Sequence, residues 1–355
     1  TVQAKDANDN DLTTGGSTVS VSVSGANTAG PIAATDNGDG TYTASNTPTS
    51  VGTDDVAITL GGGAISGSPY PSTVSPGAAS AANSTATVPG GEAGSATTIT
   101  VQAKDANDND LTTGGSTVSV SVSGANTAGP LAATDNGDGT YTASYTPTTV
   151  GIDDVAITLG GAAISGSPYS STVTPGPASA ANSTATVPDG TAAVATTITV
   201  QAKDANDNDL TTGGATVSVS VTGANTAGPI AATDNGDGTY TASYTPTAVG
   251  TDNVAITLDG GTISGSPYTS TVSAGGAVAA QSTATVPDGT AGSATSITVQ
   301  GRDAGGNPVS SGGETVVVTV SGANAAGPIT ATDNGDGTYT ASYTPTIAGT
   351  DDVAI

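Results

Sequence analysis

The sequence predicts an all-β protein built from tandem β-sandwich domains, and three observations lead to this prediction. The string TVQAKDANDNDLTTGG begins at Thr1, Thr100 and Thr199, and a weaker copy begins at Thr298, so the chain repeats every 99 residues. Short segments within each repeat alternate apolar and polar residues, and the apolar ones are mostly Val and Ile, which favour strands. The 51 glycines and 19 prolines are typical of a chain that turns often.

The repeat length indicates independent domains. It matches a free-standing β-sandwich domain and is too long for a solenoid unit that depends on its neighbours. Pro-Gly or Gly-Gly pairs between units predict short linkers, so that the domains follow one another as beads on a string. We expect the first domain to lack its first strand and the last domain its last strand, as in a window cut from a longer array. The expected domains are 1–77, 78–176, 177–275 and 276–355.

Each strand can be placed in order in the second unit. Val118, Val120 and Val122 alternate with serines, and this period of two predicts a half-buried antiparallel strand. Alternation predicts three further strands in the same way, and three less regular segments bring the total to about seven, the number of an immunoglobulin-like sandwich. The expected strands are 84–88, 97–103, 117–122, a weak strand near Leu131, 141–145, 155–159 and 169–174.

One turn stands out between two of these strands. Asp135–Gly139 reads DNGDG, and its Asn-Gly and Asp-Gly pairs supply the positive φ that tight hairpins need. We therefore expect a hairpin turn. The alternative is a cation loop, since carboxylate and amide oxygens are close together in this string.

Composition excludes several classes of function. The chain has 4 basic and 30 acidic residues, and the net charge of −26 disfavours nucleic acid and anionic membranes as partners. Without cysteine there are no disulfides or zinc–thiolate sites, and no apolar run is long enough to span a membrane. The chain also lacks histidine and has about one basic residue per repeat, so we expect no enzyme activity.

Several motifs follow one another in a fixed order. DNGDGTYTASYTP at Asp135–Pro147 is followed by Gly151 and by ISGSPY at Ile164–Tyr169, and the first part recurs in all four units. This series resembles the filamin-type immunoglobulin-like repeat, and the resemblance covers essentially the whole chain. It implies a tandem array of immunoglobulin-like domains, as in bacterial or algal surface proteins.

The sequence departs from the family pattern at one core position. The family usually has an aromatic residue there, and this chain has Asp54, Asp153, Asp252 and Asp351. Burying a Phe-sized side chain stabilises a domain by about 1.5–3 kcal/mol, so we expect a thinner core. We expect packing between domains or chains, bound cations or glycans to compensate.

An Asp- and Asn-rich stretch follows the second strand in the first three units, as DANDND at 105–110. It resembles the D-x-N-D-N calcium linker of cadherins, and its oxygens suit calcium. The stretch also matches positions 1, 3 and 5 of an EF-hand calcium loop, but the glycine and the glutamate of that loop are missing, and the fourth unit reads DAGGNP. The alternative, a polar turn, is therefore favoured. If calcium is a cofactor, the expected ligands are Asp6, Asn8, Asn10, Asp11, Asp105, Asn107, Asn109, Asp110, Asp204, Asn206, Asn208 and Asp209.

Two asparagines are candidate attachment sites for glycans. Asn83 and Asn182 each begin an Asn-Ser-Thr acceptor triplet, and the fourth unit has Gln281 at the equivalent position. The alternative is chance, because such triplets arise easily in a chain rich in Ser and Thr.

Two functions agree with these features. The first is the structural part of an extracellular fibre, surface appendage or adhesin stalk that gives length and stiffness, located at the cell surface. Its partners would be copies of itself or other fibre proteins. The second is a binding or cross-linking scaffold. By resemblance to the filamin-type family, a partner peptide would add as a strand beside Thr117–Val122.

Overall fold

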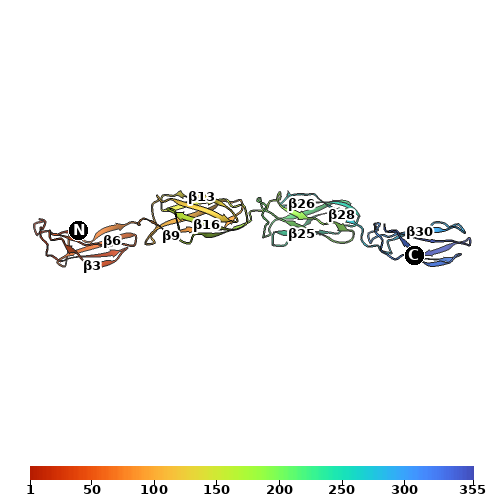
Figure 1. Cartoon of the computed structure of the whole chain (residues 1–355), viewed down its shortest axis with the longest axis horizontal. Coiled ribbons are helices and arrows are strands. Elements are labelled where there is room, and N and C mark those ends of the chain that lie inside the picture. The colour runs from red at the N-terminus through yellow and green to blue at the C-terminus, as the bar shows by residue number, and fades with distance from the viewer. The chain divides into compact units, whose positions relative to one another are not determined.

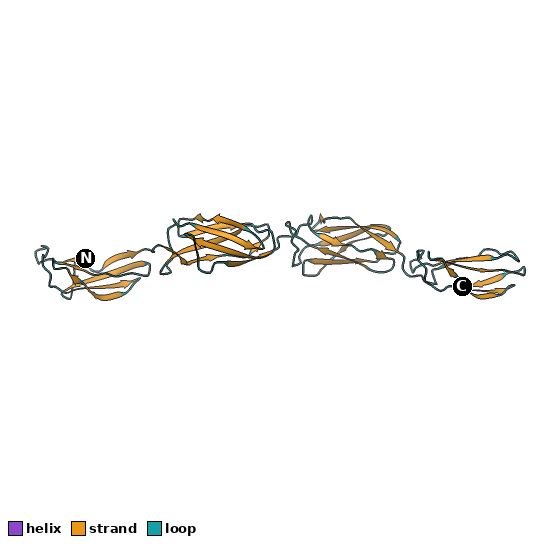
Figure 2. Ribbon diagram, in the orientation of Figure 1, coloured by secondary structure: helices purple, strands orange, loops and turns teal.

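The computed structural model describes all 355 residues and contains strands and loops but no helix (Figure 2). No membrane-spanning helix is therefore present. The chain forms two compact units, Thr1–Thr174 and Pro175–Ile355, and each unit contains two repeats. Every strand pairs only with strands of its own repeat (Figure 1). The predicted all-β class with tandem sandwiches is confirmed.

The second repeat has two antiparallel sheets that face each other. One sheet has the order β10-β18-β16-β12-β13, with β17 beside β16 and only the β10–β18 pair parallel, and the other has the order β14-β15-β11-β9. All seven predicted strands are present, and the short β10, β14 and β17 are additional. The strands are β9 (Ala79–Thr87), β10 (Gly91–Glu92), β11 (Thr97–Asp105), β12 (Val118–Gly124), β13 (Ala128–Ala132), β14 (Thr134–Asp135), β15 (Thr140–Tyr145), β16 (Gly151–Leu159), β17 (Ala162–Ala163) and β18 (Tyr169–Thr174).

The core of this repeat consists of the alternating apolar positions of the facing strands. Val120 of β12 lies opposite Ile157 of β16, and Val101 of β11 lies opposite Tyr141 of β15. These four side chains are fully buried together with Ile99. Because side chains in a strand alternate between its two faces, the serines and threonines between them point outward.

The third repeat has the same two sheets, with the orders β20-β28-β26-β22-β23 and β19-β21-β25-β24, and β27 beside β26. Its core again has a buried tyrosine, Tyr240, between the sheets. Its strands are β19 (Thr184–Thr186), β20 (Gly190–Thr191), β21 (Thr196–Gln201), β22 (Val217–Gly223), β23 (Ala227–Ala231), β24 (Thr233–Asp234), β25 (Thr239–Tyr244), β26 (Gly250–Leu258), β27 (Gly261–Thr262) and β28 (Tyr268–Ser273).

The first and fourth repeats have smaller sheets. The first repeat has β1-β5-β4 without a counterpart of β9, and the fourth has β32-β31-β35 without a counterpart of β18. The first repeat's strands are β1 (Val2–Gln3), β2 (Val19–Gly25), β3 (Ala29–Ala33), β4 (Thr35–Asp36), β5 (Thr41–Thr43), β6 (Gly52–Leu60), β7 (Gly63–Ala64) and β8 (Tyr70–Val74). The fourth repeat's strands are β29 (Thr283–Thr285), β30 (Thr295–Gln300), β31 (Val317–Gly322), β32 (Ala326–Thr330), β33 (Thr332–Asp333), β34 (Thr338–Tyr343) and β35 (Asp351–Ala354).

The structure corrects the predicted edge for strand addition. Residues Thr117–Val122 lie almost entirely in β12, which pairs with β16 on one side and with β13 on the other. The backbone groups of β12 are therefore already paired, and the edge of this sheet is β13. Pro130 lies in β13 and has no N–H to offer a partner strand, which is a common protection of sheet edges.

The DNGDG string forms the predicted hairpin turn between β14 and β15. Asp135 Oδ1 accepts the N–H of Gly137 at 2.9 Å, and Asp138 Oδ1 accepts the N–H and hydroxyl of Thr140 at 2.9 and 2.6 Å. Gly137 and Gly139 have φ of 82° and 87°. The carboxylates thus stabilise the turn by local hydrogen bonds.

Candidate functional site at the Asp-Asn loops

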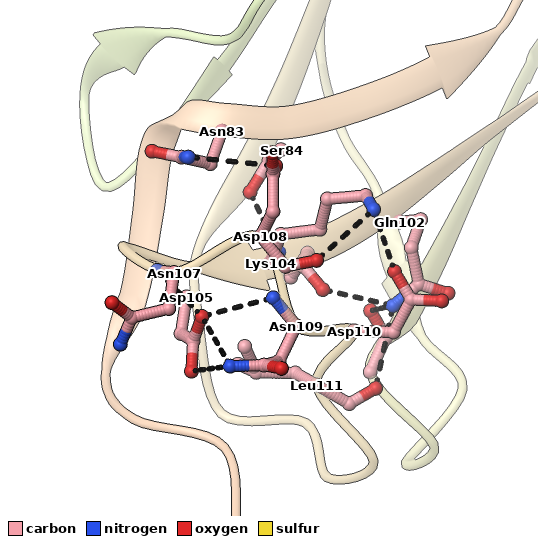
Figure 3. A network of polar contacts seen from close by, with 12 residues as sticks. Asn83, Ser84, Gln102, Lys104, Asp105, Asn107, Asp108, Asn109, Asp110 and Leu111 are labelled. Atoms are coloured by element: carbon pink, nitrogen blue, oxygen red, sulfur yellow. Dashed lines mark hydrogen bonds and ion pairs between the residues drawn. The ribbon is translucent and has the colours of Figure 1, made fainter. Parts of the chain in front are cut away.

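The Asp-Asn stretch of the second repeat forms a loop around one carboxylate, that of Asp105 at the end of β11 (Figure 3). Asp105 Oδ1 accepts the backbone N–H groups of Asn107 at 2.8 Å and Asn109 at 3.0 Å. The Asn109 amide donates to Oδ1 at 3.1 Å and to Oδ2 at 2.9 Å, and the N–H of Gly77 donates to Oδ2 at 2.9 Å. Asp105 is only 2% exposed, so the loop supplies the partners that a buried carboxylate requires.

The same hydrogen bonds determine the charge of this carboxylate. The Asn109 amide and then the Gly77 N–H lower the pKa of Asp105 to about 2, against the opposing effect of burial. Hydrogen bonds donated to the ionised form of a carboxyl group favour that form. Asp105 is therefore an anion at neutral pH, with N–H donors on both of its oxygens.

The last predicted calcium ligand of this loop faces a cation of the chain itself. Asp110 Oδ1 lies 3.0 Å from Lys104 Nζ, and Lys104 Nζ also donates to the carbonyl of Asp108 at 3.3 Å. No group of three or more acidic side chains that could hold a metal ion comes together in the chain. A cation bound here would have to replace N–H donors on Asp105 and the lysine on Asp110. Calcium binding stays a prediction.

The other repeats build the same loop around the equivalent aspartates, Asp6, Asp204 and Asp303. Each accepts the backbone N–H groups of the residues two and four positions later, and each accepts the amide of the asparagine four positions later. Lysine pairs with the last aspartate of the loop in the first and third repeats. The remaining predicted ligands are placed in this way as Asn8, Asn10, Asp11, Asn206, Asn208 and Asp209.

The two candidate glycan acceptors lie beside these loops and are partly exposed. Asn83 Nδ2 is 3.4 Å from Asp108 Oδ1, and Asn182 Nδ2 is 3.0 Å from Asp207 Oδ1 (Figure 3 shows the first pair). A sugar on either nitrogen would change this contact. Glycosylation of the two asparagines stays a prediction.

A second polar cluster lies at the position where the sequence predicts a thinner core. Asp153 is fully buried in β16 and accepts the N–H of Asn126 at 2.7 Å, the Asn126 amide at 3.2 and 3.1 Å, and the Tyr145 hydroxyl at 2.9 Å. Burial and the hydrogen bond to Asp153 raise the pKa of Tyr145. Asn126 Oδ1 in turn accepts the N–H groups of Thr148 and Thr149, both at 2.9 Å.

This cluster fixes the loop between β15 and β16 with hydrogen bonds from the repeat interior. The cluster was not predicted from the sequence, although the sequence contains a signal for it. An aspartate occupies the position of Asp153 in all four units, and an asparagine stands 27 residues before it each time, at Asn27, Asn126, Asn225 and Asn324.

Comparison with known proteins agrees with this architecture. The family model described as "Filamin/ABP280 repeat" matches four segments of the chain, 1–71, 78–170, 177–269 and 273–355. Filamin-C of Rattus norvegicus and filamin-C of Mus musculus are each 32% identical over 340 residues. These alignments cover 89% of this chain and 11% of filamin-C, so the chain spans about a tenth of the length of these relatives.

A solved structure is similar as well. FdeC, described as a broadly conserved Escherichia coli adhesin, superposes with a TM-score of 0.54 at 31% identity. The match covers 78% of this chain and 92% of the FdeC chain. Filamin repeats and adhesins are structural or binding proteins rather than enzymes.

Proposed function

We propose, from the premise that this chain belongs to the filamin repeat family, that it is part of the stalk of a cell-surface adhesin. The match to FdeC carries this proposal, because it extends over most of both chains and FdeC is an adhesin. A fold does not by itself name a task, so the proposal rests on this relative together with the features of the chain.

Three features of the chain support a stalk. The strands of each repeat pair only among themselves, so repeats can be added without changing their neighbours' sheets. The outward positions of the strands carry mostly Ser and Thr, which suits contact with water along the full length of a repeat. The net charge of −26 keeps such chains soluble and apart.

The location can be tested on intact cells of the source organism. Antibodies raised against this chain should label cells that have not been permeabilised, and protease added outside should release peptides of the repeats. Electron microscopy of the released material should show threads with an axial repeat of domain size. Labelling only after permeabilisation, or globular particles in the micrographs, would contradict the proposal.

A further inference from the structure

The Asp-Asn loop of the second repeat contacts the repeat that precedes it. The Asn109 amide donates a hydrogen bond to the carbonyl of Thr49 at 2.8 Å. The N–H of Val51 donates to Asn109 Oδ1 at 3.3 Å. One side chain thus bonds both a donor and an acceptor in the loop between β5 and β6 of the first repeat.

The second repeat holds Asn109 firmly from its own side. The same amide bonds the carboxylate of Asp105, and Asp105 also accepts the N–H of Gly77 at 2.9 Å. Gly77 lies in the linker between β8 and β9. One carboxylate therefore joins the linker to the loop that reaches the preceding repeat.

The first repeat holds its side of the contact from its interior. Asn27 Oδ1 accepts the N–H groups of Thr49 and Ser50, both at 2.9 Å. The N–H of Asn27 donates to Asp54 at 2.7 Å, and Asp54 is buried. A continuous series of hydrogen bonds thus runs from the core of the first repeat, through Thr49, to Asn109.

The junction between the third and fourth repeats has the same contact. The Asn307 amide donates to the carbonyl of Thr247 at 2.9 Å and to Asp303, which accepts the N–H of Gly275 at 3.1 Å. The N–H of Thr247 donates to Asn225 Oδ1 at 2.8 Å. The contact is therefore built twice, once in each unit of the chain.

The fourth repeat keeps the two residues that this contact needs but lacks counterparts of Asn107 and Asp110, the other two predicted calcium ligands of the loop. Its loop retains Asp303 and Asn307, the counterparts of Asp105 and Asn109. It has lost the other polar residues of the stretch, which are replaced by Gly305, Gly306 and Pro308. The two residues that remain are the two that form the contact with the preceding repeat.

We infer that Asp105 and Asn109, with their counterparts Asp303 and Asn307, restrict bending between neighbouring repeats. We call Asp105, Asn109, Gly77, Thr49 and Val51 the junction network. Interfaces between domains are usually small and permit motion, and directional hydrogen bonds on both sides of a short linker limit that motion. The restriction of bending is argued from these hydrogen bonds alone, and only its biological use rests on the proposed stalk function. A stalk that bends freely would not hold an adhesive tip away from the cell.

The test is a distance measurement across the first junction in the full chain. The chain has no cysteine, so Ser22→Cys in β2 and Thr100→Cys in β11 give two spin-label sites without background. Both positions are exposed. Pulsed electron–electron double resonance then gives the distribution of distances between the two spin labels. We expect a broader distribution in Asn109→Ala than in the parent.

Asn107→Ala is the matched control. It removes the same type of side chain from the same loop, but Asn107 bonds Asp105 through its backbone N–H. We expect the parental width and parental unfolding in this control. Asn109→Ala also removes two hydrogen bonds from the buried Asp105 carboxylate and should unfold at a lower temperature, so the distances are measured well below that temperature, where the variant is folded. A second variant, Asn109→Asp, keeps the side-chain volume and removes the amide donors, and it should broaden the distribution as well.

Three outcomes would overturn the inference. These are an unchanged width in both Asn109 variants, equal broadening in Asn107→Ala, and broadening of the parent when EGTA removes calcium. The last would assign the junction to a cation. None of these outcomes depends on where the protein is located, so the inference and the proposed surface location fail separately.

Discussion

At the scale of the residue, the aspartates of this chain act chiefly as acceptors of hydrogen bonds from its own backbone. Asp153 and its partner Asn126 fix a loop from the core, whereas Asp105 gathers the donors of a second loop and of the linker. A buried carboxylate is stable only when its oxygens are paired, and both residues meet that condition. Much of the acidic composition is therefore used for local structure.

The pKa of Asp105 gives a prediction for the response to acid. A carboxyl group whose pKa is lower in the folded state contributes stability above its unfolded pKa, near 3.9, and loses it as the pH falls. Because the folded value is about 2, the contribution of Asp105 should be complete above about pH 4 and lost as the pH falls through 2.

Carbon-13 NMR of the carboxyl groups measures this directly. The Asp105 carboxyl should titrate near 2 in the parent and closer to the ordinary value in Asn109→Ala, since the largest lowering effect comes from the Asn109 amide. The same Asn107→Ala control should leave the titration unchanged. An ordinary Asp105 pKa in the parent would contradict the hydrogen bonding described here.

At the scale of the element, the period-two pattern placed the regular strands. It located the four strands at 97–103, 117–122, 141–145 and 155–159, because their alternate apolar residues must face the core, whereas the other three expected strands were less regular segments. It could not show which strands are neighbours. The strand addition that the resemblance implied beside Thr117–Val122 therefore meets a strand that is already paired on both sides. The pattern also missed the contact of Asn109 with Thr49, because the two residues are 60 positions apart and only folding brings them together.

The glycines of the DNGDG hairpin give a prediction at this scale. A Cβ on Gly139 would lie 1.9 Å from the carbonyl oxygen of Leu111, whereas a Cβ on Gly137 would meet nothing within 4 Å. Both residues have positive φ, which costs about 1–2 kcal/mol for a residue with a side chain. Gly137→Ala should destabilise the second repeat by about that amount, and Gly139→Ala should destabilise it much more.

Hydrogen exchange measured by mass spectrometry can localise the effect. The segment at 145–154 differs in sequence between the second and third repeats, so its peptides can be told apart, and the third repeat serves as an internal control. Exchange in the second repeat should be faster in Gly139→Ala than in Gly137→Ala. Equal effects of the two substitutions would mean that the approach of Leu111 to the turn is not required.

At the scale of the whole molecule, the repeats are joined one after another by short linkers, and all of them carry negative charge. The charge of −26 is spread over a sequence that repeats every 99 residues, so every repeat repels its neighbours. Such repulsion extends about 30 Å at 0.01 M salt but only about 8 Å at 0.15 M salt. A chain with free junctions would therefore change its average dimensions as salt is added, and a chain with restricted junctions would change less.

Small-angle X-ray scattering of the full chain over this range of salt tests the consequence. The radius of gyration of the parent should depend weakly on salt, because the hydrogen bonds of the junctions, and not charge repulsion, limit bending. In the double variant Asn109→Ala with Asn307→Ala, two junctions lose their amide contacts, so repulsion alone would oppose bending there. The radius of gyration of the variant should then fall more steeply as salt is added. Parallel salt curves for the two chains would show instead that bending is limited by the linkers themselves.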